Sequence, residues 1–301
     1  FILWLFFRWD ETDMRVKDGF LVTFLFYVAL GTVGAIPFAQ EAGINLSWPN
    51  ALFESFSGIT TTGATVITGL DHLPKSILYY RQQLQWLGGM GIIVLAVAIL
   101  PMLGIGGMQL YRAETPGPVK DSKLTPRIKQ TAMALWSIYL GLTAFCAVAY
   151  WLAGMSFFDA VCHSFSTVAI GGFSTHDSSI GYFDSALIES IAIVFMVLSG
   201  INFGLHFFAL KEKALFHYFQ DDEVVWYLLI LATAVLMVTL ILVSHQVYEA
   251  PKAFRLAAFE VVSIFTTTGF ATADFSVWPN MIPYLIFFGA FTGACAGSTG
   301  G

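Results

Sequence analysis

The sequence predicts an all-α polytopic membrane protein, in which repeated units of helix, re-entrant pore loop and helix surround a central pore. Three observations support this fold class. First, the 301 residues are 57% apolar and only 11% charged, whereas soluble domains carry about 25% charged residues. Second, one phrase of sequence occurs three times. Third, uncharged stretches around the copies each exceed the roughly 20 residues that a helix needs to cross a bilayer: 19–40, 82–111, 130–158, 190–210, 224–248 and 275–301.

The repeated phrase is a short apolar helix that runs into threonines or small residues and then a glycine. Its copies end at Gly63, Gly172 and Gly269. A half-helix of about a dozen residues is too short to span a bilayer, so each copy must enter and leave on one face. Non-helical backbone at that depth survives only where it is buried in protein or lines a water-filled cavity. We therefore expect the three loops to converge on one axis.

The repeat divides the chain into three pore units of an expected four. Residues 1–9 read as the end of an earlier membrane helix, followed by unit 1 (10–110), unit 2 (111–215) and unit 3 (216–301). We expect unit 3 to be truncated, and the spacing predicts a fourth unit, absent here, about a hundred residues past the third glycine. The half-helices are expected at 48–59, 157–167 and 251–265, and the spans at 19–38, 84–103, 131–151, 187–210, 224–243 and from 281 onward.

The basic residues indicate the orientation in the membrane. When the loops are assigned to alternate sides, ten of the 14 Lys and Arg residues fall on one side. The positive-inside rule makes that side the cytoplasm, so the glycine loops open outward. The other four are Lys75, Arg81, Lys252 and Arg255. We expect Arg81, at the outer end of a span, to snorkel to the interface.

The glycine loops have the chemistry of a cation filter. Backbone carbonyls that point inward replace the water around a cation without fixed charge, so the ion can also leave. Threonine adds a hydroxyl oxygen, glycine permits backbone angles closed to other residues, and the half-helix points the negative end of its dipole at the ion. Residues 60–63 and 266–269 fit closely, whereas 169–172 fit through the backbone alone. The alternative, a small-residue packing patch, is disfavoured by three aligned copies.

Four stretches, 57–65, 85–91, 163–176 and 295–301, resemble the Trk/Ktr/HKT superfamily of potassium transporters. The chain is closest to the bacterial Trk-type potassium uptake membrane subunit over essentially its whole length. The resemblance implies four units around one pore, a homodimer in the bacterial inner membrane, and a cytoplasmic ring of nucleotide-binding regulatory subunits of the TrkA type. The implied cargo is K⁺, with Rb⁺ accepted and Na⁺ less favoured. We expect the lipid bilayer as the surroundings and no nucleic-acid partner.

The resemblance also implies residue roles. The carbonyls that coordinate K⁺ fall on Thr61, Thr62, Ile170, Gly171, Thr267 and Thr268, beside the filter glycines Gly63, Gly172 and Gly269. The small-residue run 289–301 becomes an intramembrane loop that gates the pore. Its gate residues are Gly289, Gly293, Gly297, Ser298, Thr299 and Gly300. From the sequence alone, a tight small-residue helix interface is an equal alternative for this run.

Acidic residues recur in the half-helices. Glu54 and Glu260 occupy equivalent positions, where unit 2 has His163. Membrane carboxylates are functional candidates by default. Because the charge is not repeated in every copy, we expect Glu54, Glu260 and Thr60 to brace the filter by hydrogen bonds rather than to bind the ion.

Other polar residues carry weaker expectations. Asp71, His72 and Asp177 are expected to add weak attraction for cations at the pore mouth. Asn202 and His206 fall inside a predicted span, where they are expected to form hydrogen bonds between helices.

These features predict a monovalent-cation channel or transporter, with potassium preferred, and not an enzyme. An intramembrane hydrolase needs a nucleophile with a base in reach, and Ser174, His176 and Ser298 sit in no recurring frame of that kind. The remaining alternative is a secondary transporter of a small solute, with broken helices at the midplane. Such transporters usually have inverted repeats, whereas these units point the same way.

Overall fold

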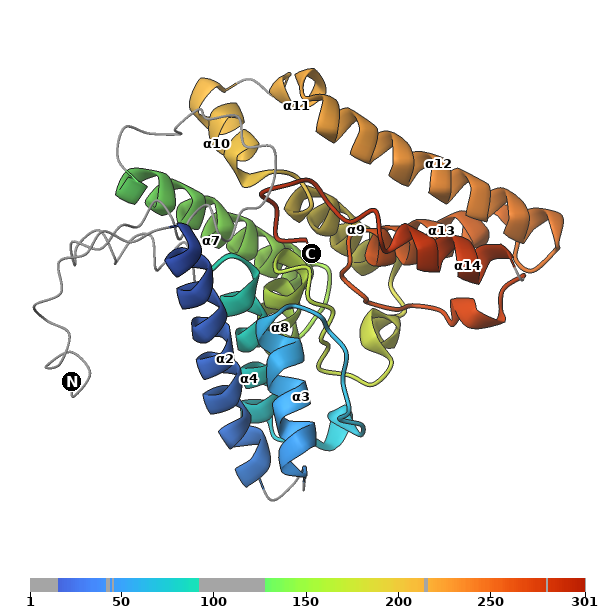
Figure 1. Ribbon diagram of the computed structural model, residues 1–301. Helices are drawn as coiled ribbons and strands as arrows, with labels where there is room; N and C mark the ends of the chain where they lie inside the picture. Colours follow the sequence, from blue (N-terminus) through green and yellow to red (C-terminus); the bar gives the residue numbers. More distant parts are fainter. Residues whose placement is uncertain are drawn as a thin grey trace, which may run out of the picture.

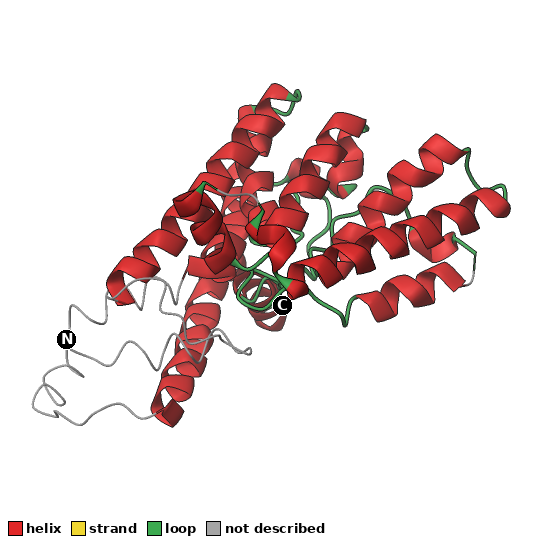
Figure 2. Ribbon diagram, turned by 90° about the horizontal axis from the view of Figure 1, so that it is seen from above, coloured by secondary structure: helices red, strands yellow, loops and turns green. Residues whose placement is uncertain are grey.

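The computed structural model describes residues 16–41, 44, 46–91, 128–213, 216–279 and 281–300, and these ranges are helical and without strands (Figure 1, Figure 2). The helices are α2 Val16–Gln40, α3 Trp48–Ile59, α4 Lys75–Trp86, α7 Ile128–Leu152, α8 Phe157–Val168, α9 Ala186–Ser199, α10 Phe203–Glu212, α11 His217–Gln220, α12 Asp222–Ser244, α13 Ala250–Phe265 and α14 Met281–Gly289. Short helical turns are η1 Leu70–His72, η2 Leu87–Gly91, η4 Ser179–Phe183 and η5 Phe275–Val277.

Each unit contains a long helix packed against a short one. The pairs are α2 with α3, α7 with α8, and α12 with α13, and Figure 1 shows the first and last of them side by side. The short helices lie where the sequence predicts half-helices. α3 has the predicted bounds, α8 ends one residue later and α13 begins one residue earlier.

Local sequence explains where the half-helices start. α3 and α13 have proline in the first turn, where its missing N–H would have no helical partner in any case. α8 instead begins at Ser156, whose hydroxyl accepts a hydrogen bond from the Asp159 N–H. Such a cap satisfies one of the orphan donors of the first turn.

The return segments differ from the prediction. α4 begins at Lys75 rather than at residue 84, directly after Pro74, and runs into the π-helical turn η2. The predicted continuation to residue 103 lies outside the described residues, as do 1–9 and the loop 111–127. The span predicted at 187–210 is wrong as a single helix, because α9 and α10 meet at an angle of 95°.

The break between α9 and α10 is stabilised by one local and one distant contact. The Asn202 side chain caps α10 by accepting from the Gly204 N–H. The Gly200 carbonyl accepts from the Cys295 N–H, so distant backbone satisfies a group that the interrupted helix leaves free.

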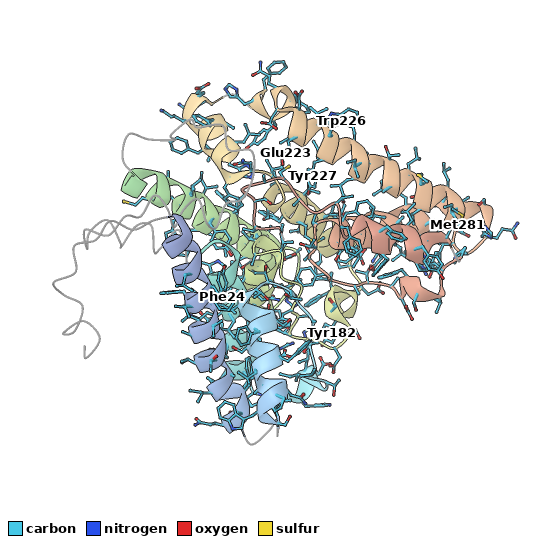
Figure 3. All side chains as sticks on the ribbon, in the orientation of Figure 1. Phe24, Tyr182, Glu223, Trp226, Tyr227 and Met281 are labelled. Atoms are coloured by element: carbon cyan, nitrogen blue, oxygen red, sulfur yellow. The ribbon has the colours of Figure 1, made fainter. Side chains whose placement is uncertain are left out.

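By length and composition, two described helices can cross a membrane: Met133–Leu152 and Asp222–Ser244. The α9–α10 pair is a third if it counts as one span, and Phe24–Gln40 is apolar but shorter. Large apolar side chains on the outside are exposed, including Trp226 at 65% and Met281 at 69% (Figure 3). Exposed apolar surface on this scale suits lipid rather than water, as expected of a membrane protein.

The apolar core has two parts. One lies in unit 1, around Phe38 and Ile59. The larger one joins units 2 and 3 and includes Tyr139, Met196 and Phe259. Helix α4 packs on α8, so unit 1 is joined to unit 2 directly beside the loops that follow the half-helices.

Candidate selectivity filter

The three loops that follow the half-helices lie side by side: loop 1 (60–65), loop 2 (169–175) and loop 3 (266–272). Gly63 lies so close to the Gly171 carbonyl that a β-carbon on it would collide with the oxygen. Gly172 lies against the Thr268 carbonyl in the same way. A β-carbon on Gly269, by contrast, would have no neighbouring described atom within 4 Å. The loops therefore follow one another in chain order, and loop 3 is open on its far side.

The backbone of each loop alternates in handedness. The residue two before each glycine and the glycine itself have positive φ: Thr61 and Gly63 at 54° and 76°, Ile170 and Gly172 at 53° and 79°, Thr267 and Gly269 at 66° and 84°. The residue between them does not. Such alternation turns successive peptide groups the same way, whereas in a strand they alternate. Left-handed Thr and Ile are uncommon and cost free energy, so the surroundings must hold them.

Loop 1 is held by its own unit. The Ser57 carbonyl accepts from the Thr62 N–H (2.9 Å), and the Ser57 hydroxyl donates to the Ala64 carbonyl (2.5 Å). The hydroxyls of Thr60 and Thr62 are 2.8 Å apart. Loop 3 repeats these contacts through Ser263, Thr266, Thr268 and Phe270. Two loops with one internal structure argue for one shared purpose.

Loop 2 lacks these hydroxyls, because Ala169 and Gly171 occupy the places of the two threonines. The buried amide of Gln85, from α4 of unit 1, contacts it instead. Its Nε2 donates to the Gly171 carbonyl, and its Oε1 accepts from the Ser166 hydroxyl and the Phe173 N–H. The sequence reasoning gave Gln85 no role, although its place in the motif at 85–91 was a signal.

Arg81 is fully buried, so the prediction that it snorkels to the interface is wrong. Its Nε donates to Glu54 Oε1 (2.8 Å), and its other nitrogens donate to the Thr65 hydroxyl (2.9 Å) and the Ser174 carbonyl (3.1 Å). The guanidinium carbon also lies 4.3 Å from the centre of the Phe173 ring. A buried charge needs a partner and further hydrogen bonds, and Glu54 with the backs of loops 1 and 2 supplies them.

Residues at the position of Glu54 make similar contacts in the other units. Glu54 accepts from the Val66 N–H, and Glu260 accepts from the N–H groups of Thr272 and Ala273. His163 Nε2 lies 2.9 Å from the Ser174 hydroxyl. In each unit a half-helix side chain is thus bonded to the chain that leaves the loop.

Within the described part of the chain, no group of three or more His, Cys, Asp or Glu side chains could hold a metal ion. A cation at the loops would therefore meet backbone carbonyls and threonine hydroxyls, which are the oxygens of a neutral filter.

Asp71 and Asp177, which were expected to attract cations at the pore mouth, both accept hydrogen bonds within the protein. Asp71 accepts from His176 Nδ1, and this bond lowers the pKa of the Asp71 carboxyl. Asp177 accepts from the Gly69 N–H (3.0 Å). His176 is also stacked on Tyr182, with ring centroids 3.5 Å apart. These contacts join the outer loops of units 1 and 2.

The segment 290–300 is not helical and lies against the break in unit 2. The Thr299 hydroxyl donates to the Val168 carbonyl (2.8 Å), at the C-terminal end of α8. The Phe203 N–H donates to the Gly297 carbonyl (3.0 Å), and the Ala296 N–H donates to Glu223 at the start of α12 (2.7 Å). Of the two readings from sequence, a small-residue helix interface is therefore wrong for 290–300.

His206 forms hydrogen bonds between helices, as expected, whereas the Asn202 side chain caps its own helix, α10. His206 contacts the Leu198 carbonyl across the break (2.9 Å) and the Tyr218 hydroxyl on α11 (2.8 Å). Because the predicted span is broken, both residues stabilise the corner itself.

Comparison with known proteins identifies a family for this chain. A family model described as TrkH, cation transport protein, matches residues 2–301. The chain is 60% identical over 294 residues to the Trk system potassium uptake protein TrkH of Halomonas elongata, covering 98% of this chain and 61% of that protein. It is 54% identical over 301 residues to the TrkH of Escherichia coli K12, covering 100% and 62%.

A solved structure is similar as well. The crystal structure of the potassium transporter TrkH from Vibrio parahaemolyticus matches with a TM-score of 0.84 and 52% identity, covering 97% of this chain and 59% of that one. The chain thus spans about three fifths of the length of these relatives. The family predicted from the sequence motifs is confirmed: the chain belongs to the TrkH family of cation transport proteins.

Proposed function

We propose that this chain forms the larger part of the pore of a potassium uptake protein in the bacterial inner membrane. The observation that carries the proposal is the alternating backbone of three adjoining loops. The carbonyls assigned to K⁺ are those of Thr61, Thr62, Ile170, Gly171, Thr267 and Thr268, beside Gly63, Gly172 and Gly269. The names of the relatives, potassium uptake proteins, support K⁺ as the cargo and do not favour a solute transporter.

The physical reasoning starts from dehydration. A cation that enters the loops must lose most of its water, and a ring of carbonyls replaces it. The half-helices α3, α8 and α13 each end at a loop, so their partial negative ends add to the attraction. A site made of neutral carbonyl oxygens also binds weakly enough for the ion to leave. We expect Rb⁺ to pass, and Na⁺ to be less favoured.

We assign the bracing of the filter to Thr60, Glu54 and Glu260. The Thr60 hydroxyl is bonded to the Thr62 hydroxyl and to the Phe56 carbonyl at the end of α3. Each of the two carboxylates is bonded to the last residue of its loop and to the residue that follows it. All three act from behind the carbonyls, where a change alters the shape of the ring rather than its charge.

We assign the gate to Gly289, Gly293, Gly297, Ser298, Thr299 and Gly300. Gly293 and Gly297 have positive φ, so this segment uses conformations that other residues rarely adopt. Its hydrogen bonds run to the end of α8 and to the α9–α10 corner, which makes a displacement of the segment a way to open or close the path below the filter.

The ring itself needs a further member. The carbonyl of the next loop lies against Gly63 in loop 1 and against Gly172 in loop 2. Among the described residues, no such group lies against Gly269 in loop 3. We propose that a fourth loop occupies this position in the complete pore. Pairing of two protomers and a cytoplasmic nucleotide-binding ring belong to the same proposal, and the resemblance to the family supports them.

Two experiments test the proposal. Rubidium uptake into proteoliposomes that contain the protein should be rapid, independent of any coupling solute, and poorly inhibited by Na⁺. Crystals soaked in Rb⁺ or Cs⁺ should give anomalous scattering among loops 1, 2 and 3. Heavy-ion signals that lie elsewhere, together with uptake that is blocked by an organic solute, would replace the filter with a solute site.

A further inference from the structure

Gln85 crosses from one unit to the loop of the next. Its Nε2 donates to the Gly171 carbonyl at 2.5 Å, and its Oε1 accepts from the Ser166 hydroxyl at 2.7 Å and the Phe173 N–H at 3.1 Å. Because a backbone N–H can only donate, the Phe173 contact fixes which end of the amide is oxygen. The NH₂ group must therefore face the Gly171 carbonyl. Gln85 is fully buried, where hydrogen bonds are strong and their loss is costly.

The Gln85 amide occupies the space of a missing side chain. Gly171 aligns with Thr62 of loop 1 and Thr268 of loop 3, whose hydroxyls are bonded to the threonine two residues earlier, each at 2.8 Å. A β-carbon on Gly171 would lie 2.6 Å from Gln85 Oε1 and would collide with the amide carbon. A threonine at 171 and the Gln85 amide therefore exclude one another.

Loop 2 is also the loop with the least internal restraint. Gly171 and Gly172 have no side chains, and glycine has the widest choice of backbone angles. The peptide group between them can rotate unless something holds its oxygen. The Gln85 N–H group is placed to do that.

We propose that Gln85 is the positioning residue of loop 2, which takes the place of the threonine hydroxyls of loops 1 and 3 and fixes the direction of the Gly171 carbonyl. This inference rests on the proposed function, because the direction of that carbonyl matters to ion preference only if the loops form a filter. The second loop is thus completed by a side chain from the first unit, although its own sequence lacks the polar groups.

A matched pair of variants tests the role. Gln82 is one turn earlier on α4 and equally buried, yet neither of its amide atoms has a hydrogen-bond partner among the described residues. Gln85→Ala and Gln82→Ala therefore remove the same volume from the same helix. In proteoliposomes we expect Gln85→Ala to reduce the preference for Rb⁺ over Na⁺ about tenfold, which is the effect that loss of the bond to the Gly171 carbonyl allows among the three bonds removed. Gln82→Ala should keep the wild-type preference.

A conservative variant guards against a folding defect. Gln85→Met keeps the length and approximate volume of the side chain but has no donor for the Gly171 carbonyl. It should lose ion preference as Gln85→Ala does, at wild-type yield in the membrane. Wild-type preference in either Gln85 variant would overturn the inference.

A rescue experiment separates positioning from general packing. Gly171 has an ordinary negative φ, so threonine can be placed there once the amide is gone. Gly171→Thr alone should be harmful, because the new side chain collides with Gln85. The triple variant Gln85→Ala, Ala169→Thr and Gly171→Thr rebuilds the hydroxyl pair of loops 1 and 3. It should return to within about threefold of the wild-type preference, given the usual coupling of contacting residues.

The outcomes distinguish the two levels of the proposal. If the wild-type protein shows no Rb⁺ uptake or no preference over Na⁺, the filter itself is wrong, and the role of Gln85 is wrong with it. If the wild type is selective and the triple variant is no better than Gln85→Ala, the filter stands and the inference about Gln85 is overturned.

Discussion

Two kinds of residue fix the conformation of the loops: glycines within them and buried polar side chains behind them. Gly63 is constrained twice, by its positive φ and by the Gly171 carbonyl of the neighbouring loop against its α-carbon. Behind the loops, Arg81, Glu54 and Gln85 bond to backbone groups of the loops or of the chain beyond them. A substitution at either kind of residue should therefore alter ion preference or stability without touching the ion.

Gly63→Ser should weaken the preference for Rb⁺ over Na⁺. Serine has to adopt a left-handed backbone at a cost of about 1 kcal/mol or more, and its β-carbon collides with the Gly171 carbonyl, so loops 1 and 2 must move apart. We expect about a tenfold loss of preference in Rb⁺ uptake competed by Na⁺. Gly141→Ser on α7, where no described atom lies within 4 Å, is the control. Unchanged preference in Gly63→Ser would count against the filter assignment.

Arg81→Met should destabilise the protein strongly. The substitution leaves the Glu54 carboxylate buried without its partner, which typically costs about 3–5 kcal/mol. Thermal unfolding in detergent should show a large fall in the midpoint, and little change for Lys252→Met, which removes an exposed cation on α13.

The double variant Glu54→Gln with Arg81→Met provides the check on that explanation. If the two residues act as one pair, the double variant should lose less stability than the sum of the single losses. Additive losses would mean that each residue acts through separate contacts.

Helix bounds that are set by nearby residues could be predicted from the sequence. Features that depend on residues far away in the chain could not. The bounds of α3, α8 and α13 follow from proline, a serine cap and the glycine loops, all within a few residues. The break after α9 depends on Cys295, which takes the Gly200 carbonyl. Gln85 and Arg81 bond to loop 2 across sequence separations of 86 and 93 residues, so no periodic pattern reveals their partners.

The segment 290–300 is the element whose displacement we expect to control flow. Thr299→Val preserves its shape but removes the hydroxyl that bonds to the Val168 and Ser199 carbonyls. A lost hydrogen bond of about 1 kcal/mol should release the segment and raise Rb⁺ uptake several-fold, with the preference over Na⁺ unchanged. Ser190→Ala, which removes a hydroxyl bonded within α9, is the control. A change of preference in Thr299→Val would mean that this segment belongs to the filter rather than to the gate.

At the scale of the whole molecule, the units are joined on two levels. At loop 2, the side chains of Arg81 and Gln85 extend from unit 1 into unit 2. In the loops between the helices, Asp71 and the backbone of Gly69 in unit 1 bond to His176 and Asp177 in unit 2. Because loops 1 and 2 are adjacent, loss of the contacts between Asp71 and His176 should also change the position of loop 1 relative to loop 2.

Asp71→Asn tests the outer contact through its dependence on pH. The bond from His176 lowers the pKa of Asp71 below 3.8, so the carboxylate stabilises the folded state above the unfolded value of about 3.9. That contribution disappears as the pH falls through the folded value. We expect the wild type to unfold at a higher temperature than Asp71→Asn at pH 6, and the difference to shrink below pH about 4 as the carboxyl is protonated. Asp177 and His72 also lower the pKa of this carboxyl, and His72 has the smallest effect, so His72→Gln should reduce the pH dependence only slightly. A difference between wild type and Asp71→Asn that persists at the lowest pH would assign the effect to packing, and the two outer loops would then be joined by shape rather than by charge.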